Sequence, residues 1–344
     1  MSKMSRQGRI LLCIFAVLLQ WQPWSVASAT DLVPPKGYSV GFTATTVDGV
    51  QTYVCSDGEW IKRGSSADMT AADGSSLGTY WSVYNKETRA IDYFWSIRNS
   101  DGTRIESGYP ISGLQASVLR SFVTATSAVS QYLAIIKIHR YAGDAAQVAF
   151  VALTGTQGGL PPREELCSSP TATADVPFAG NFTFYNQDRQ PPANLPQSLT
   201  PKANFVQVVF LEGKVMYKFT KSGQWLYRGI SATIRDVAGG NNLGKFGTVK
   251  KPDAFGSKLL LQFTDPNGFF LLGQKVARPI QMSADGFGWQ LLKVTTSGGF
   301  VSPVGKFTYV LIGGTMGGLA PRIAGRTFGM TWGSPFTAQC YLYT

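Results

Sequence analysis

Charged residues and histidine are both scarce in this chain of 344 residues. Asp, Glu, Lys and Arg make up 15% of the sequence, and His139 is the single histidine. One histidine and few thiols do not supply the ligands of the usual zinc site, so we expect no metal centre. Hydrophobic residues still reach 44% and aromatic residues 12%, which excludes a disordered or collagen-like protein. This length favours two domains.

Apolar runs of membrane-spanning length are also absent. The longest N-terminal run covers residues 10–19, about half of the roughly 20 residues that a spanning helix needs. It is followed by the small-residue site Ala27-Ser28-Ala29 and preceded by the basic residues Lys3, Arg6 and Arg9. This pattern predicts a secretory signal peptide over residues 1–29, cleaved after Ala29. We therefore expect a secreted protein of the extracellular space or cell wall, with no transmembrane segment.

Cysteine is sparse as well, since signal removal leaves only Cys55, Cys167 and Cys340. Three cysteines cannot all pair within one chain. In an oxidising compartment we expect one disulfide and one buried or intermolecular thiol, which leaves dimerisation open. The chain holds one glycosylation sequon, at Asn181. Asn181 opens an alternating segment that looks like a strand, where its amide is harder to reach.

The chain contains two copies of one unit. Residues 58–64 (Gly-Glu-Trp-Ile-Lys-Arg-Gly) match residues 223–229 (Gly-Gln-Trp-Leu-Tyr-Arg-Gly) at identical spacing. Near the ends of the copies, Thr156–Arg163 matches Thr315–Arg322. The unit is much longer than a solenoid repeat, so each copy should be a domain with its own core. We expect a first domain over residues 30–190 and a second over 191–344, with a proline-rich linker over 191–202.

Short alternating runs punctuated by glycine turns dominate both copies. They predict an all-β protein with two tandem β-sandwich or β-barrel-like domains. The exception is Leu114–Phe122, where apolar residues recur at four-residue steps. That spacing predicts a helix in the first copy, without a counterpart in the second.

The shared segments resemble the secreted "domain of unknown function 3455" family of fungi, bacteria and plants. The resemblance covers both copies and is carried by Tyr53-Val54-Cys55, Gly58-Glu59-Trp60, Gly158-Gly159-Leu160-Pro161 with the following Cys167, and Pro177-Phe178-Ala179. It implies a disulfide between Cys55 and Cys167. The second copy departs from the pattern, because Phe219 stands where Cys55 stood.

The resemblance brings no established activity with it. Members of this family are sometimes labelled malate dehydrogenase, and the sequence offers no support for that label. It has no Gly-x-Gly-x-x-Gly between a strand and a helix, and no alternation of strands and helices. We therefore expect no cofactor.

One pattern suggests a hydrolase. Residues 74–78 (Gly-Ser-Ser-Leu-Gly) match a nucleophile elbow centred on Ser76, and Asp92 and His139 follow in order. The elbow requires a strand before the serine and a helix after it, whereas a turn precedes Ser76 and a strand follows. A secreted hydrolase with its site in the first copy is thus the alternative hypothesis.

The charge is divided between the copies. The whole chain carries +11, and signal removal leaves 11 − 3 = +8. Residues 30–190 hold 12 basic and 15 acidic residues, giving −3, whereas residues 191–344 hold 16 and 5, giving +11. We expect a non-enzymatic binding or structural protein whose second domain contacts an anionic polysaccharide or acidic lipid surface, and no nucleic acid. The candidate binding residues are Lys214, Lys218, Lys221, Arg228, Lys245, Lys250 and Lys251.

Overall fold

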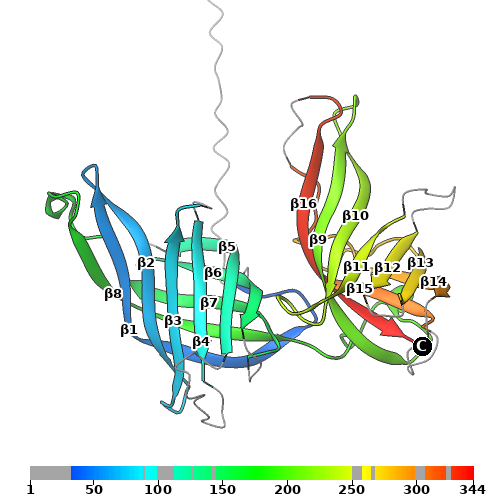
Figure 1. Cartoon of the computed structure of the whole chain (residues 1–344), viewed down its shortest axis with the longest axis horizontal. Helices are drawn as coiled ribbons and strands as arrows, with labels where there is room; N and C mark the ends of the chain where they lie inside the picture. The colour runs from blue at the N-terminus through cyan, green and yellow to red at the C-terminus, as the bar shows by residue number, and fades with distance from the viewer. Residues whose placement is uncertain are drawn as a thin grey trace, which may run out of the picture.

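The protein folds into two closed β-barrels in tandem (Figure 1). The computed structural model describes residues 32–87, 90–98, 112–124, 127–140, 145–249, 258–264, 268–298, 307–322 and 327–344. The predicted signal peptide and two candidate binding residues, Lys250 and Lys251, lie outside these ranges. The predicted all-β fold is confirmed, and the domains are closed barrels instead of sandwiches.

Each strand of the first barrel pairs antiparallel with the next one along the chain. The barrel closes where the last strand pairs with the first, as in Thr43 opposite Thr183. Closure pairs the two edge strands with each other, so neither is left open. The strands are β1 (Tyr38–Ser56), β2 (Glu59–Thr70), β3 (Ser76–Asn85), β4 (Ala90–Ile97), β5 (Ser112–Thr124), β6 (Ser127–Arg140), β7 (Val148–Gly158) and β8 (Thr173–Gln187).

The second barrel repeats this up-and-down order, with its last strand again paired to its first. Two short 3-10 helices, η2 (Glu164–Leu166) and η3 (Gln197–Leu199), lie in the connections before and after β8. The strands are β9 (Phe205–Phe219), β10 (Trp225–Arg235), β11 (Asn242–Thr248), β12 (Leu259–Phe263), β13 (Phe270–Lys275), β14 (Gln290–Gly298), β15 (Tyr309–Gly317) and β16 (Thr331–Tyr343).

The helix predicted over Leu114–Phe122 is wrong, because this segment forms most of β5. Residues four apart lie on one face of a strand as well as on one face of a helix, so the spacing alone does not separate the two. Leu114 and Ala116 are both buried in the barrel core, which is the two-residue period of a strand. The fifth strand of the second barrel, β13, is its counterpart by order.

The duplication extends to individual hydrogen bonds. Tyr53 Oη donates to the Gly159 carbonyl at 2.7 Å in the first barrel, and Tyr217 Oη donates to the Gly318 carbonyl at 2.7 Å in the second. Gly159 and Gly318 have φ of 68° and 73°, a conformation that favours glycine. The Gly-Gly turn found in both copies of the sequence is therefore the same structural device in each barrel.

Three long strands of each barrel extend well past the others (Figure 1). In the second barrel they are β9, β10 and β16, with 15, 11 and 13 residues, whereas β11 to β13 have 7, 5 and 6. We name residues 213–229 with 327–335 the second flap. The first flap is the equivalent part of the first barrel, residues 49–64 of β1 and β2 with residues 160–177, which lead into β8 and include its start.

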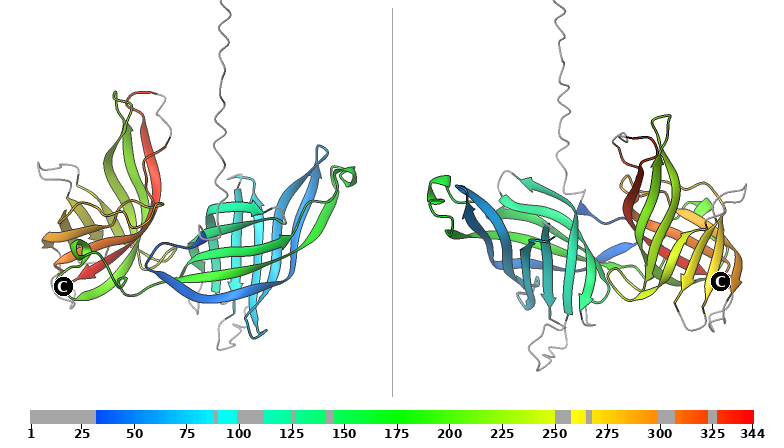
Figure 2. Two further views of the ribbon diagram at one scale, coloured as in Figure 1. Left: turned by 180° about the vertical axis from the view of Figure 1, so that it is seen from behind. Right: turned by 45° about the horizontal axis from the view of Figure 1, so that its top comes forward.

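Each barrel has its own core, and a third cluster joins the two. Phe150 of β7 and Phe210 of β9 are both fully buried in this joint cluster together with Leu32, which precedes β1. Beside it, Glu212 accepts hydrogen bonds from Lys137 Nζ at 2.6 Å and from Arg235 Nε at 3.2 Å. Figure 2 shows the barrels meeting at one end, where the segment before β1 also lies. The barrels therefore share buried apolar surface.

The proline-rich segment after β8 also packs against the protein. Leu199 at the end of η3 is fully buried. It belongs to a cluster on the outer side of the second barrel with Trp289 and Tyr341. This part of the predicted linker is therefore docked on the second barrel.

Candidate functional site

The hydrolase candidates do not come together. Asp92 lies opposite Val83, seven residues along β3 from Ser76, which is about 23 Å at the rise of a strand. His139 lies on β6, and two strands, β4 and β5, lie between β6 and β3. His139 is therefore three strand spacings, about 14 Å, from the strand that carries Ser76. Triad side chains must lie within hydrogen-bonding reach of one another, so this arrangement does not form one.

The cysteines occupy contrasting environments. Cys55 and Cys167 form a disulfide with a Cα–Cα distance of 5.2 Å, as the family resemblance implied. Cys340 is a free thiol, fully buried in the core of the second barrel, and burial raises its pKa. A disulfide between two chains through Cys340 would require β16 to leave the barrel. Asn181 lies in β8 with an exposed side chain, and its Oδ1 accepts from Thr45 Oγ1 at 3.2 Å.

Four of the candidate basic residues lie on the second flap. Lys214 and Lys218 share the outward face of β9, as their parity predicts. Lys221 and Arg228 are exposed near the β9–β10 turn. Lys245 is exposed on the outer face of β11, away from the flap. Residues 213–229 contain no Asp or Glu, and neither do residues 286–344, so the flap is a cationic surface without carboxylates of its own.

Exposed apolar side chains accompany these cations. The pairing of β9 with β10 and β16 sets Leu226 and Thr331 beside Lys218. Phe328 lies under the Lys221 ammonium, with 5.3 Å between Nζ and the ring centroid. The exposed fractions are 37% for Met216, 48% for Leu226, 58% for Phe328, 39% for Met330 and 42% for Trp332. Met216 and Leu226 share the outer face of the flap with Lys214 and Lys218, whereas Trp332 lies opposite Tyr217 on the inner face.

The first flap has the opposite character. Its five carboxylates outnumber its three basic residues, and a disulfide joins two of its segments near the tip. The carboxylates are Asp57, Glu59, Glu164, Glu165 and Asp175, and the basic residues are Lys62, Arg63 and Arg163. Three exposed apolar side chains, Ile61, Leu160 and Leu166, still lie on it. The two equivalent projections therefore differ in net charge, −2 for the first flap and +4 for the second, in the same direction as the two copies.

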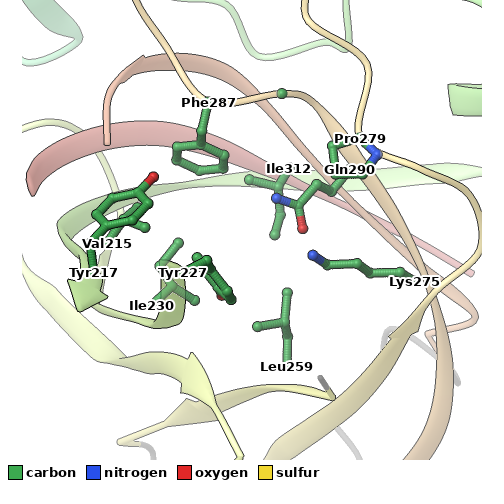
Figure 3. Close-up of a pocket in the computed structure, with 11 residues that line it drawn as sticks. Val215, Tyr217, Tyr227, Ile230, Leu259, Lys275, Pro279, Phe287, Gln290 and Ile312 are labelled. Atoms are coloured by element: carbon green, nitrogen blue, oxygen red, sulfur yellow. The ribbon is translucent and has the colours of Figure 1, made fainter. Parts of the chain in front are cut away.

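A pocket of about 220 Å³ lies inside the second barrel at the base of the second flap (Figure 3). Its walls are mostly apolar and aromatic, and they come from β9, β10, β12 to β15 and the segment before β14. Figure 3 shows the Lys275 ammonium and the Gln290 amide pointing into it. The lining residues are Val215, Tyr217, Tyr227, Ile230, Leu259, Lys275, Pro279, Phe287, Gly288, Gln290 and Ile312.

The side chain of Lys275 is partly buried among mostly apolar and aromatic side chains. Its Nζ lies 5.8 Å from the centroid of the Tyr227 ring. Burial lowers the pKa of the Lys275 ammonium below its ordinary value, and it forms no ion pair with any residue described. Gln290 Oε1 is also buried without a hydrogen-bond partner in the described part of the chain. The pocket thus offers a positive charge and an unused acceptor between apolar walls.

The same positions in the first barrel are polar. Gln51 and Ser65 stand where the second barrel has Val215 and Ile230, and the Ser65 hydroxyl lies 2.9 Å from the Tyr80 hydroxyl and 2.8 Å from that of Ser82. The first barrel also has an inward-facing lysine, Lys62, which lies on β2 opposite Tyr53. Burial lowers its pKa to about 8. The two interiors therefore differ in chemistry.

Replacing Lys62 with methionine should alter the pH dependence of stability. The folded pKa of about 8 lies below the unfolded value of roughly 10.4, so the unfolded chain binds more protons between these values. The free energy of unfolding of the unmodified protein should rise from pH 8 to pH 9.5. Lys62→Met should be more stable at pH 7 and show a smaller rise, as measured by urea unfolding. The exposed Lys86→Met is the control, and equal slopes in all three proteins would contradict the assignment.

Sequence reasoning missed Lys275 and Gln290. Leu271, Gly273 and Lys275 share one parity along β13. Because Leu271 and Gly273 face the core, a lysine at the same parity could have been recognised from the sequence as an inward-facing charge. Gln290 gave none, because its place in the pocket depends on the pairing of β14 with β15.

The fold and these surfaces define a protein of two tandem eight-stranded up-and-down barrels, the second of which contains a ligand-sized pocket. No family model matches the chain, and neither the curated proteins nor the solved structures include a match to it. Within the described ranges, no helix has the length and apolar content to cross a membrane.

Proposed function

We propose that this chain is a secreted, non-enzymatic binding protein whose second flap attaches to an acidic lipid surface. The single observation that carries the proposal is the composition of that flap, which has the cations Lys214, Lys218, Lys221 and Arg228, exposed apolar side chains such as Leu226 and Phe328, and no carboxylate. The predicted signal peptide and the disulfide of the first barrel support secretion. Membership of the resembled family stays a prediction.

A lipid surface fits this flap better than a soluble polysaccharide does. Lysine and arginine near an anionic bilayer contribute about 1 kcal/mol each. Aliphatic side chains such as Leu226 and Met330 gain free energy by entering the boundary between headgroups and acyl chains. A hydrated polysaccharide has no acyl region for them to enter. Trp332 and Phe328 supply the aromatic side chains that prefer the same boundary.

Vesicle sedimentation tests the proposal directly. The chain without its signal peptide should bind vesicles of phosphatidylcholine with 30% phosphatidylserine and should bind phosphatidylcholine alone far more weakly. Replacing the four flap cations with glutamine should weaken binding at least 100-fold, on the order expected from the per-charge contribution. Raising the salt from about 0.05 M to 0.5 M should weaken it too.

The first flap supplies the matched control. Leu226→Ser, Phe328→Ser and Trp332→Ser together should abolish binding, whereas Ile61→Ser, Leu160→Ser and Leu166→Ser on the acidic flap should leave it unchanged. Binding to polygalacturonate with none to vesicles would assign an anionic polymer and overturn the lipid proposal. Equal loss in both triple variants would also overturn it.

A further inference from the structure

The geometry points to a second binding site, for a small aromatic carboxylate that carries a hydroxyl group, inside the pocket of the second barrel. The pocket lies on the inner face of the strands, whereas the lipid-binding cations proposed above lie on the outer face or at the tip. The two proposals are therefore independent.

The size of the pocket limits the ligand. A volume of about 220 Å³ is larger than the 150 Å³ cavity that holds benzene and smaller than the 300 to 1,000 Å³ of sites for drug-sized ligands. It suits one ring with a short substituent. A long acyl chain would not fit.

The aromatic and apolar side chains of the pocket walls favour a ligand with an aromatic ring. Tyr217 and Phe287 face the pocket from one side, and Ile230, Leu259 and Ile312 form apolar walls (Figure 3). The rings of Tyr217 and Tyr227 are 6.4 Å apart with an angle of 78° between them. An aromatic ligand can pack edge to face against such rings, which adds to the gain from burying its apolar surface.

The polar groups select the substituents. The Lys275 ammonium has lost part of its hydration through burial, and no described carboxylate pairs with it. The carboxylate of a ligand would supply a charge-assisted hydrogen bond in place of the lost water. Gln290 Oε1 is a buried acceptor with no described partner, and a hydroxyl of the ligand would satisfy it. By strand register, Tyr132 of the first barrel stands where the second has Gln290, and Val118 stands where it has Lys275. The first barrel should therefore not bind this ligand.

Calorimetry with three related probes tests the assignment on the chain without its signal peptide. 4-Hydroxyphenylacetate should bind with a Kd on the order of 100 µM, as its size allows. Phenylacetate, which lacks the hydroxyl, and 4-hydroxyphenylethanol, which lacks the charge, should each bind at least 10-fold more weakly. Equal binding of the alcohol and the acid would overturn the role of Lys275 and with it the proposal.

Variants separate the pocket from the rest of the barrel. Lys275→Met should weaken binding roughly 10- to 100-fold, and Lys275→Arg should retain most of it. Ile230→Phe fills the pocket and should abolish binding, whereas Ser231→Phe places the same ring on the outer face of β10 and should not. Unfolding curves establish that each variant folds. Full binding by Ile230→Phe would place the ligand elsewhere and overturn the proposal.

Chemical labelling supplies a readout that does not depend on any variant. Lys275 and Lys62 are both partly buried lysines whose pKa is lowered by burial, so both should acylate readily at pH 8. Saturating 4-hydroxyphenylacetate should slow acylation of Lys275 at least fivefold and leave Lys62 unchanged, as measured by mass spectrometry. Equal protection of both lysines, or of neither, would contradict the assigned site.

Discussion

Replacing Cys55 and Cys167 together with alanine is expected to lower the free energy of unfolding by about 4 to 5 kcal/mol, from the loop-entropy relation. The two residues are 112 positions apart in sequence, so the disulfide restricts a long segment of the unfolded chain. It joins the end of β1 to the connection before β8. The effect should appear in urea unfolding as a lower midpoint for the first barrel.

Reduction supplies the control for this prediction. A thiol reductant should reproduce most of the loss in the unmodified protein and should have no effect on the double alanine variant. The second barrel has no disulfide among its described residues. Reduction should therefore affect the unfolding of the second barrel only indirectly, through the joint cluster that it shares with the first barrel. A double variant as stable as the unmodified protein would show that the disulfide adds nothing to the barrel.

The second large effect is expected from Phe210→Ala. Phe210 points out of the second barrel into the joint cluster with Phe150 and Leu32, and truncating a buried phenylalanine costs about 3 to 5 kcal/mol. The lost contacts connect the barrels. Calorimetry should therefore show two separate unfolding transitions for Phe210→Ala and a single coupled transition for the unmodified protein. The barrels would then unfold as separate units.

Phe246→Ala is the matched control. Phe246 is buried within the second barrel alone, so its truncation should destabilise that barrel by a similar amount without removing any contact between barrels. If Phe210→Ala left the two transitions as coupled as Phe246→Ala does, the joint cluster would not be what couples them.

The two interiors suggest how one duplicated unit can acquire two chemistries. The backbone contacts that define the barrel, such as the tyrosine bond to the Gly-Gly turn, are the same in both copies. The inward side chains differ, with Ser65 in the first barrel and Ile230 in the second at equivalent positions. Because closure is achieved by backbone hydrogen bonds, the interior can change without loss of the fold.

Local pattern in the sequence was enough for several conclusions. The alternation of apolar residues predicted strands, and self-comparison predicted two domains of one kind. The parity of Lys214 and Lys218 predicted their common outward face, because side chains alternate along every strand. The Cys55–Cys167 disulfide followed from a family resemblance and not from spacing.

Tertiary structure decided what depends on pairing between distant residues. Barrel closure rests on contacts such as Thr43 with Thr183, which no local period encodes. The exposed apolar side chains of the second flap include Met216, Leu226 and Trp332, which come from three different strands, and the pocket places Lys275 beside Tyr227. The sequence by itself thus determined which segments become strands and how charge is divided between the copies. The folded chain decided which side chains meet, because strand register and closure are set by long-range hydrogen bonding and burial.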